Sequence, residues 1–100
     1  MKPKNKFKFK AKVWLYKGQG AWHFISLNKK LSRELDRKFG MKKRGWGSLR
    51  VSAQVGKTEW RTSIFPDSKT GTYLLPLKSE IRKKEGIEID DMVSIGIEII

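Results

Sequence analysis

The sequence predicts a single mostly-β domain, a small barrel accompanied by two short helices. Short runs of alternating apolar and polar residues recur along the chain, and this period of two is typical of half-buried strands. Only residues 28–39 and 77–85 have a helical pattern. The length of 100 residues suits one domain with one modest core.

The first strand is expected over residues 6–17. It follows a basic segment, residues 1–5, which we expect to form a disordered tail outside the barrel domain of residues 6–100. Successive side chains of a strand point to opposite faces, so this strand has one apolar face and one cationic face. The cationic face consists of Lys6, Lys8, Lys10 and Lys12, continued by Trp14 and Tyr16.

Residues 18–20 turn the chain into a second strand, residues 21–27, which is rich in aromatic and β-branched residues. Asn28 is a favourable N-cap for the first helix. Gly40 ends that helix, and residues 41–47 are expected to form a loop. The helix has one narrow apolar stripe, made of Leu31, Leu35 and Phe39.

The rest of the chain alternates strands with turn-forming segments. Residues 49–55 alternate as a half-buried strand, and Gly56 and Lys57 form a tight hairpin turn into a strand that returns to residue 64. The remaining elements are a loop at 66–71, a short strand at 72–76, a helix at 77–85 that ends at Gly86, and a last strand at 92–100.

A weak internal repeat relates the two halves of the chain. Residues 24–31, "FISLNKKL", align with residues 74–81, "LLPLKSEI", at a spacing of 50. Each segment reads as a strand, a turn and a helix, and each is followed after a loop by an alternating strand. Two βαβ-like halves of this kind predict a pseudo-twofold barrel.

The positive charge is concentrated in one half. The whole chain has 23 Lys and Arg against 10 Asp and Glu, a net charge of +13. Residues 1–50 hold 16 basic and two acidic residues, a net of +14, whereas residues 51–100 have a net of −1. Such asymmetry favours a polyanionic partner. The alternatives are charge that serves solubility, or adaptation to high temperature, although Glu is not enriched beside Lys.

Catalytic chemistry has little support in the sequence. The chain has no cysteine and one histidine, His23, within an aromatic strand. Asp90 and Asp91 are adjacent and are typical turn formers, and no phosphate-binding glycine motif is present. We therefore expect no enzyme, no cofactor and no metal site. No apolar run is long enough for a membrane span, and we expect a cytoplasmic monomer.

The most favoured function is a binding module for DNA or RNA. Lysines on alternate strand positions could hold phosphates, and neighbouring aromatic rings could stack on bases. The alternatives are an edge strand that lysines protect against pairing, and aromatic rings that close the ends of a barrel. The candidate nucleic-acid-binding residues are Lys6, Lys8, Lys10, Lys12, Trp14, Lys42, Lys43, Arg44 and Trp46.

A second hypothesis is a module that binds a protein partner or a small anionic ligand. Its pocket would be lined by Trp60 and Arg61, with Trp46 beside them. The two hypotheses differ in salt dependence, because nucleic-acid binding releases condensed counterions whereas the pocket would not.

Residues 73–99, "YLLPLKSEIRKKEGIEIDDMVSIGIEI", resemble the helix and closing strand of AbrB/MazE-type swapped-hairpin barrels. The resemblance implies structural roles for Pro76, Arg82 and Asp91, with Arg82 bonding loop carbonyls or Asp91. Asp90 stands where that pattern has glycine.

The whole chain is more similar to a bacterial family of unknown function with the double-split β-barrel fold, whose members accompany YdeI/OmpD-associated domains. The matching segments are "FKAKVW", "GAWHFISL", "RGWGSLRVSAQVGKTEWRTSIFP" and the segment at 73–99. This resemblance implies a barrel made from one duplicated chain, and it implies no established activity.

Overall fold

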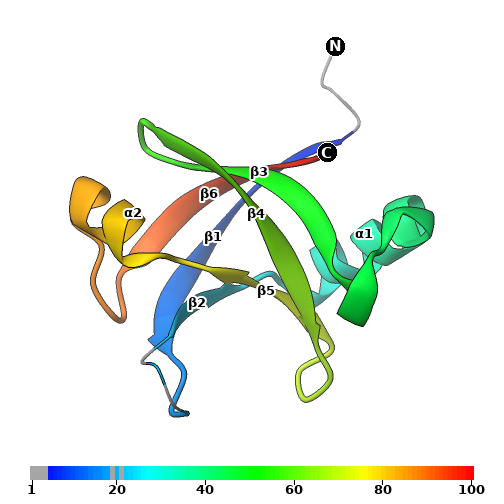
Figure 1. The fold of residues 1–100 in the computed structure, drawn as a ribbon, viewed down its shortest axis with the longest axis horizontal. Coiled ribbons are helices and arrows are strands. Elements are labelled where there is room, and N and C mark those ends of the chain that lie inside the picture. The colour runs from blue at the N-terminus through cyan, green and yellow to red at the C-terminus, as the bar shows by residue number, and fades with distance from the viewer. Residues whose placement is uncertain (1–4, 19, 21) are drawn as a thin grey trace.

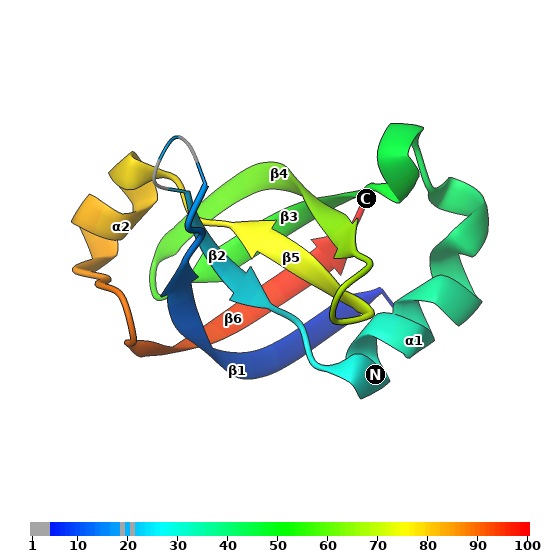
Figure 2. The ribbon, with the colours of Figure 1, turned by 90° about the horizontal axis from the view of Figure 1, so that it is seen from below.

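The computed structural model describes residues 5–18, 20 and 22–100. Six strands form a closed antiparallel barrel in the order β1-β2-β5-β4-β3-β6, with a helix at each of two opposite ends (Figures 1 and 2). This confirms the mostly-β class, the barrel and the two helices. The elements are β1 (Lys6–Leu15), β2 (His23–Ser26), α1 (Lys29–Phe39), β3 (Leu49–Val55), β4 (Thr58–Asp67), β5 (Thr72–Pro76), α2 (Ser79–Glu85) and β6 (Met92–Ile99).

The barrel consists of two sheets that share their longest strands. In the first sheet, β6 and β3 pair with each other and with the early parts of β1 and β4. In the second sheet, β2 and β5 pair with each other and with the late parts. β1 changes sheet after Lys12, and β4 changes sheet after Ile64. Each long strand therefore has one partner strand early and another late, which leaves a split beside its first part.

A helix lies beside each split. The ring of Phe39, at the end of α1, packs edge-on against Phe7 of β1 with centroids 6.2 Å apart. At the other end of the barrel, Thr58 of β4 donates a hydrogen bond of 2.6 Å from its hydroxyl to Oε2 of Glu85 in α2. The helices thus attach to the strand segments that have one strand partner each.

The two halves are related by a pseudo-twofold that maps β1, β2, α1 and β3 onto β4, β5, α2 and β6. Every pairing in the barrel is preserved by this exchange. The backbone N–H of Leu27 donates to the carbonyl of Tyr73, and that of Leu77 donates to the carbonyl of His23, both at 2.9 Å. These bonds repeat at the predicted spacing of 50. The repeating unit is β-β-α-β, one strand longer than the βαβ unit predicted, because the long strand before each repeated segment also belongs to it.

The core lies inside the barrel and is formed by the inward residues of every strand. Alternation along β3 is complete, because Leu49, Val51, Ala53 and Val55 are buried while Arg50 and Gln54 are exposed. Other residues of the core are Val13, Ile25, Leu27, Leu31, Leu35, Ile64, Tyr73, Leu75, Leu77, Ile87, Ile95, Ile97 and Ile99.

α1 begins and packs as its sequence predicts. Oδ1 of Asn28 accepts a hydrogen bond of 2.7 Å from the N–H of Leu31. Leu31 and Leu35 are buried, and the buried hydroxyl of Ser32 accepts a bond of 3.1 Å from the N–H of Tyr73. After α1 the chain makes two single 3₁₀ turns, at Gly40–Lys42 and Gly45–Gly47, where the sequence predicted an irregular loop.

Several predicted boundaries were wrong at their ends. β1 ends at Leu15 rather than residue 17, and β2 covers His23–Ser26, with Ala21 outside the described residues. α2 begins at Ser79 because the N–H of Leu77 still bonds to β2. β6 ends at Ile99, one residue early.

The loop predicted at 66–71 is also shorter than expected. Pro66 and Asp67 belong to β4, because the strand continues into the second sheet and pairs there with Tyr73 and Thr72. Asn5, which belongs to the predicted tail, exchanges hydrogen bonds with the backbone of Ile99. The rest of the predicted tail lies outside the described residues.

The turn before β6 forms without the glycine of the AbrB/MazE pattern. Asp90 takes a left-handed conformation with φ of 71°, which aspartate tolerates better than most residues. Its N–H donates 2.8 Å to the carbonyl of Val13, and the N–H of Val13 donates 2.9 Å to the carbonyl of Asp91. The carboxylate of Asp91 accepts a bond of 2.8 Å from the N–H of Glu88.

Two other residues assigned structural roles lie in the same half of the chain. Nε of Arg82 donates 3.2 Å to the carbonyl of Leu77, a loop carbonyl of the kind expected. Pro76 is buried at the end of β5, opposite Phe24 of β2.

Substitutions at Asp90 test this turn. We expect Asp90→Gly to leave the free energy of unfolding unchanged or higher, because glycine has no steric cost at positive φ. Asp90→Val should lower it by about 1–2 kcal/mol, since a β-branched side chain clashes there. Urea denaturation of both variants measures this, and equal losses would contradict the left-handed backbone.

Candidate nucleic-acid interface

The four lysines of β1 that the sequence predicts as binding residues lie in a row on the outer face of the first sheet. The register places Lys6 opposite Glu98 and Lys8 opposite Gly96 of β6. Lys10 and Lys12 continue the row opposite Ser94 and Met92. All four are exposed. We call this set of four residues the lysine row.

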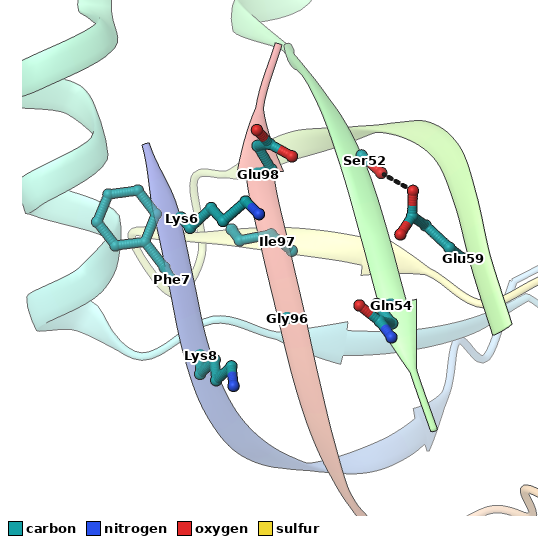
Figure 3. Close-up of a pocket in the computed structure, with 9 residues that line it drawn as sticks. All are labelled: Lys6, Phe7, Lys8, Ser52, Gln54, Glu59, Gly96, Ile97 and Glu98. Atoms are coloured by element: carbon teal, nitrogen blue, oxygen red, sulfur yellow. Dashed lines mark hydrogen bonds between the residues drawn. The ribbon is translucent and has the colours of Figure 1, made fainter. Parts of the chain in front are cut away.

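A shallow groove runs along the outer face of β6, beside the lysine row. Part of it is a hollow of about 590 Å³ whose lining includes Lys6, Lys8, Ser52 and Gln54 (Figure 3). A second hollow of about 500 Å³ extends it towards Lys10 and shares Lys8, Gln54 and Gly96 with the first. Figure 3 shows Lys6 and Lys8 extending from β1 towards β6 over this groove.

Gly96 keeps the floor of the groove open. A Cβ atom built at this position would meet nothing within 4 Å, and its φ is not positive. Neither steric crowding nor backbone conformation therefore requires a glycine here. Glycine inside a strand costs stability and often marks a place where another molecule approaches the backbone closely.

The ammonium groups of the lysine row are not engaged by acids. Across the described part of the chain, the ion pairs within 4 Å are Lys38–Glu34 and Lys43–Asp36. Two carboxylates line the groove itself. Glu98 is opposite Lys6, and Glu59 accepts a hydrogen bond of 3.3 Å from the Ser52 hydroxyl.

The residues Lys42, Lys43 and Arg44, which we call the basic loop, lie at the C-terminal end of β6. A hollow of about 460 Å³ has Lys42, Lys43 and Arg44 on one side and Ile99 and Ile100 of the β6 end on another. Arg50 of β3 also lines this hollow and lies on the outer face of the first sheet. The lysine row and the basic loop are therefore both arranged around β6.

Lys43 is held by a structural cluster. Its Nζ lies 2.7 Å from Oδ1 of Asp36 and 5.6 Å from the centre of the Tyr73 ring. The Tyr73 hydroxyl donates a 2.5 Å hydrogen bond to the same carboxylate oxygen. These contacts attach the basic loop to α1 and β5. Lys42 and Arg44, on either side, remain exposed.

The cluster shifts the pKa of each of its members. Burial raises the pKa of Asp36, but hydrogen bonds from Lys43 and Tyr73 lower it by more, so it lies below its usual value. The pKa of Lys43 is raised by its hydrogen bond to Asp36 and by Tyr73. The pKa of Tyr73 is raised by burial and by its bond to Asp36.

The candidate tryptophans occupy different environments. Trp14 is half-buried, its Nε1 donates 2.9 Å to the hydroxyl of Ser26, and its ring lies 5.3 Å from that of Phe24. Trp46 is 94% exposed and has φ of 65°, a strained conformation for a large side chain. Trp14 therefore packs on the outer face of the second sheet, whereas Trp46 stands free beside the basic loop.

The pocket of the second hypothesis does not assemble around β4. Trp60 points inward opposite Ala53, is half-buried, and packs against the core. Its buried indole N–H has no partner among the described residues. Arg61 is the next residue of the strand, so it points outward and is exposed. One pocket cannot be lined by both side chains.

Sequence reasoning missed the neighbours of the lysine row. Gly96, Glu98 and Ser94 belong to β6, while Ser52 and Gln54 belong to β3, and all five line the groove. Gly96 carried a usable signal, because it interrupts the polar positions of an alternating strand. The sequence held no such signal for the other four residues. Their place in the groove depends on the register of strands from distant parts of the chain.

Two further observations concern other kinds of site. Within residues 5–18, 20 and 22–100, no group of three or more His, Asp or Glu side chains is placed to hold a metal ion. None of the helices seen in this part of the chain is long and apolar enough to cross a membrane.

Fold and surface together define a small closed β-barrel with a pseudo-twofold and a row of exposed lysines beside an outer groove. Residues 9–97 match the family model described as a domain of unknown function (DUF1905). The chain therefore belongs to the DUF1905 family. No curated protein matches the sequence.

The cluster around Asp36 generates a pH prediction. Because the folded pKa of Asp36 is lowered, its contribution to stability is present above the unfolded pKa, near 3.8, and is lost as the pH falls through the folded pKa. We expect Asp36→Asn to lower the free energy of unfolding at pH 7 by about 1 kcal/mol, the usual net value of a hydrogen bond.

Thermal unfolding followed by circular dichroism from pH 7 to pH 2 measures the difference. The Tm values of wild type and Asp36→Asn should converge below pH 3.8. Glu88→Gln, at an exposed acid, serves as the charge-matched control. A difference between wild type and Asp36→Asn that persisted at the lowest pH would contradict the role of the ionised carboxylate.

Proposed function

We propose that this protein is a non-enzymatic module that binds nucleic acid through the groove along β6, with little sequence specificity. The observation that carries this proposal is the lysine row, in which four exposed ammonium groups without acidic partners stand beside an open groove. The basic loop lies at the end of β6, the strand that pairs with β1. A net charge of +13 would draw a polyanion to this surface.

The spacing of the lysine row suits a chain of phosphates. Alternate residues of a β-strand are about 7 Å apart. This is close to the distance between successive phosphates of an extended nucleic-acid strand. Contacts of this kind position a ligand without reading its bases. Low sequence specificity follows from that chemistry.

The two carboxylates near the groove would restrict the path of the ligand. Glu98 and Glu59 repel phosphates; Glu98 lies on β6 directly beside Lys6, and Glu59 lies on β4, beyond β3. The phosphate backbone would therefore follow β1 rather than the strands that carry these carboxylates. Repulsion of this kind contributes to specificity of placement.

Further proposals concern the evolutionary relationship of the protein, its oligomeric state and its cellular location. The β-β-α-β repeat supports a relationship to the AbrB/MazE-type swapped-hairpin barrels. Within this proposal the protein acts as a monomer in the cytoplasm, without a cofactor.

Removing the lysine row tests the proposal. In the quadruple variant with Lys6, Lys8, Lys10 and Lys12 changed to Gln, we expect at least tenfold weaker binding of a mixed-sequence oligonucleotide at about 0.1 M salt. The slope of log affinity against log salt should fall by about 3, because up to four phosphate contacts are lost. Fluorescence anisotropy over a salt series measures both quantities.

A variant of equal charge provides the control. Changing Lys29, Lys30, Lys83 and Lys84 to Gln removes four exposed helix lysines outside the groove. It should reduce binding much less, and both quadruple variants should keep the wild-type Tm within a few degrees. Equal effects of the two variants would contradict a defined site, and binding insensitive to salt would contradict phosphate recognition.

A second test fills the groove without removing charge. In Gly96→Val the new side chain points into open space, and valine favours strands, so the Tm should stay or rise. Binding should weaken severalfold, because the floor beneath the ligand is occupied. Ser63→Val, on β4 outside the hollows described above, is the matched control. Full affinity in Gly96→Val would place the ligand elsewhere.

A further inference from the structure

The outer face of the second sheet is apolar and aromatic, unlike that of the first. The cross-strand row at one end is Trp14, Phe24 and Pro76, and the next row contains Ser26, Leu74 and Phe65. Tyr16 and Trp22, joined by a backbone hydrogen bond of 2.8 Å, lie just beyond β1 and β2. Figure 2 looks onto β2 and β5, and both helices lie at the ends of the barrel, away from this face.

Three aromatic rings, those of Trp14, Tyr16 and Trp22, gather around Phe24, and we call these four residues the aromatic platform. The ring of Trp22 is nearly parallel to that of Phe24, at 10° and 6.2 Å between centroids. Trp14 lies 5.3 Å from Phe24, and Tyr16 meets it edge-on at 6.2 Å. Trp22 is 53% exposed and Tyr16 is 49% exposed. These two rings are therefore supported by neighbours and still accessible to a ligand.

The aromatic platform is continuous with the lysine row. Lys12, Trp14 and Tyr16 occupy successive alternate positions of the same chain segment, so the cationic surface leads directly into the rings. Lys17, which is exposed, follows Tyr16 in the chain. A ligand that is anionic along its length and carries flat apolar groups complements both parts. A protein partner complementary to the rings alone would leave the adjoining cations unmatched.

We propose that the aromatic platform stacks unpaired bases, and that the ligand of this protein is single-stranded nucleic acid rather than a duplex. This inference rests on the proposed function. In a duplex the bases are stacked on each other and cannot reach the rings, whereas an open strand places phosphates on cations and bases on aromatic side chains. Stacking on rings tolerates any base, so it agrees with low sequence specificity.

The test compares Trp22→Ala with the quadruple Lys→Gln variant on two probes. One probe is a labelled oligonucleotide of about 12 nucleotides, and the other is the duplex of the same sequence. Wild type should bind the single strand at least tenfold more tightly. Trp22→Ala should weaken single-strand binding by about 5- to 100-fold, the loss of one stacked base, with the duplex affinity and the salt slope unchanged. The quadruple variant should weaken both and reduce the slope.

Two controls separate stacking from folding. Trp22→Phe, which keeps a flat ring, should restore most of the single-strand affinity lost in Trp22→Ala. Ile89→Ala removes an exposed apolar side chain from outside the aromatic platform and should bind as wild type does. All variants should unfold at the wild-type temperature, because the side chains changed are exposed.

The outcomes distinguish this inference from the function on which it rests. Normal single-strand binding by Trp22→Ala, together with weak binding by the quadruple variant, would overturn the stacking role and leave the phosphate groove standing. No salt-dependent binding of either probe by wild type would overturn both. A wild-type dimer in sedimentation that Trp22→Ala converts to monomer would assign the aromatic platform to contact between copies, and would also overturn the inference.

Discussion

The passage of β1 and β4 from one sheet into the other is the constraint on which the structure depends. Each strand bonds to one partner in its first part and to another in its second, so one chain closes a six-stranded barrel with only two long strands. The same exchange opens two splits, and the helices attach beside them through Phe7–Phe39 and Thr58–Glu85. It also carries the outward residues of β1 from a polar surface onto an aromatic one. Fold and candidate site therefore have a common origin.

The interior keeps the pseudo-twofold, whereas the surface does not. Ile25 and Leu75 face each other across β2 and β5, and both are fully buried, so the two halves meet through equivalent core residues. On the outside, β1 carries the lysine row, but its counterpart β4 carries Glu59, Arg61 and Ser63 on its outer positions. Core positions answer to packing density, which the two halves share. Outer positions are free to change independently, and here the first half of the chain holds all the excess positive charge.

The periodicity of the sequence predicted the strands, both helices and the repeat, because those features depend on neighbours within a few residues. Alternation at Leu49–Val55 and the Asn28 cap are local signals of that kind. The missed features depend on contacts across the chain. Asp67 lies in a strand because Thr72 pairs with it in the second sheet, despite its turn-forming neighbours. Lys43 looked equivalent to Lys42, yet Asp36 and Tyr73 hold it in place. The hypothesis that Trp60 and Arg61 line one pocket was wrong for a reason visible in the sequence. Neighbouring residues of a strand point to opposite faces.

Closing the barrel within one chain has a consequence for orientation. A barrel built from two identical chains presents the same surface twice, so it looks alike from either end. In this protein the cationic segment of β1 precedes its aromatic segment, and no equivalent of the lysine row occurs on β4. The outer surface along β1 therefore has a cationic end and an aromatic end that differ from each other. A nucleic-acid strand also has a chemical direction. Its two possible orientations along this surface are therefore not equivalent.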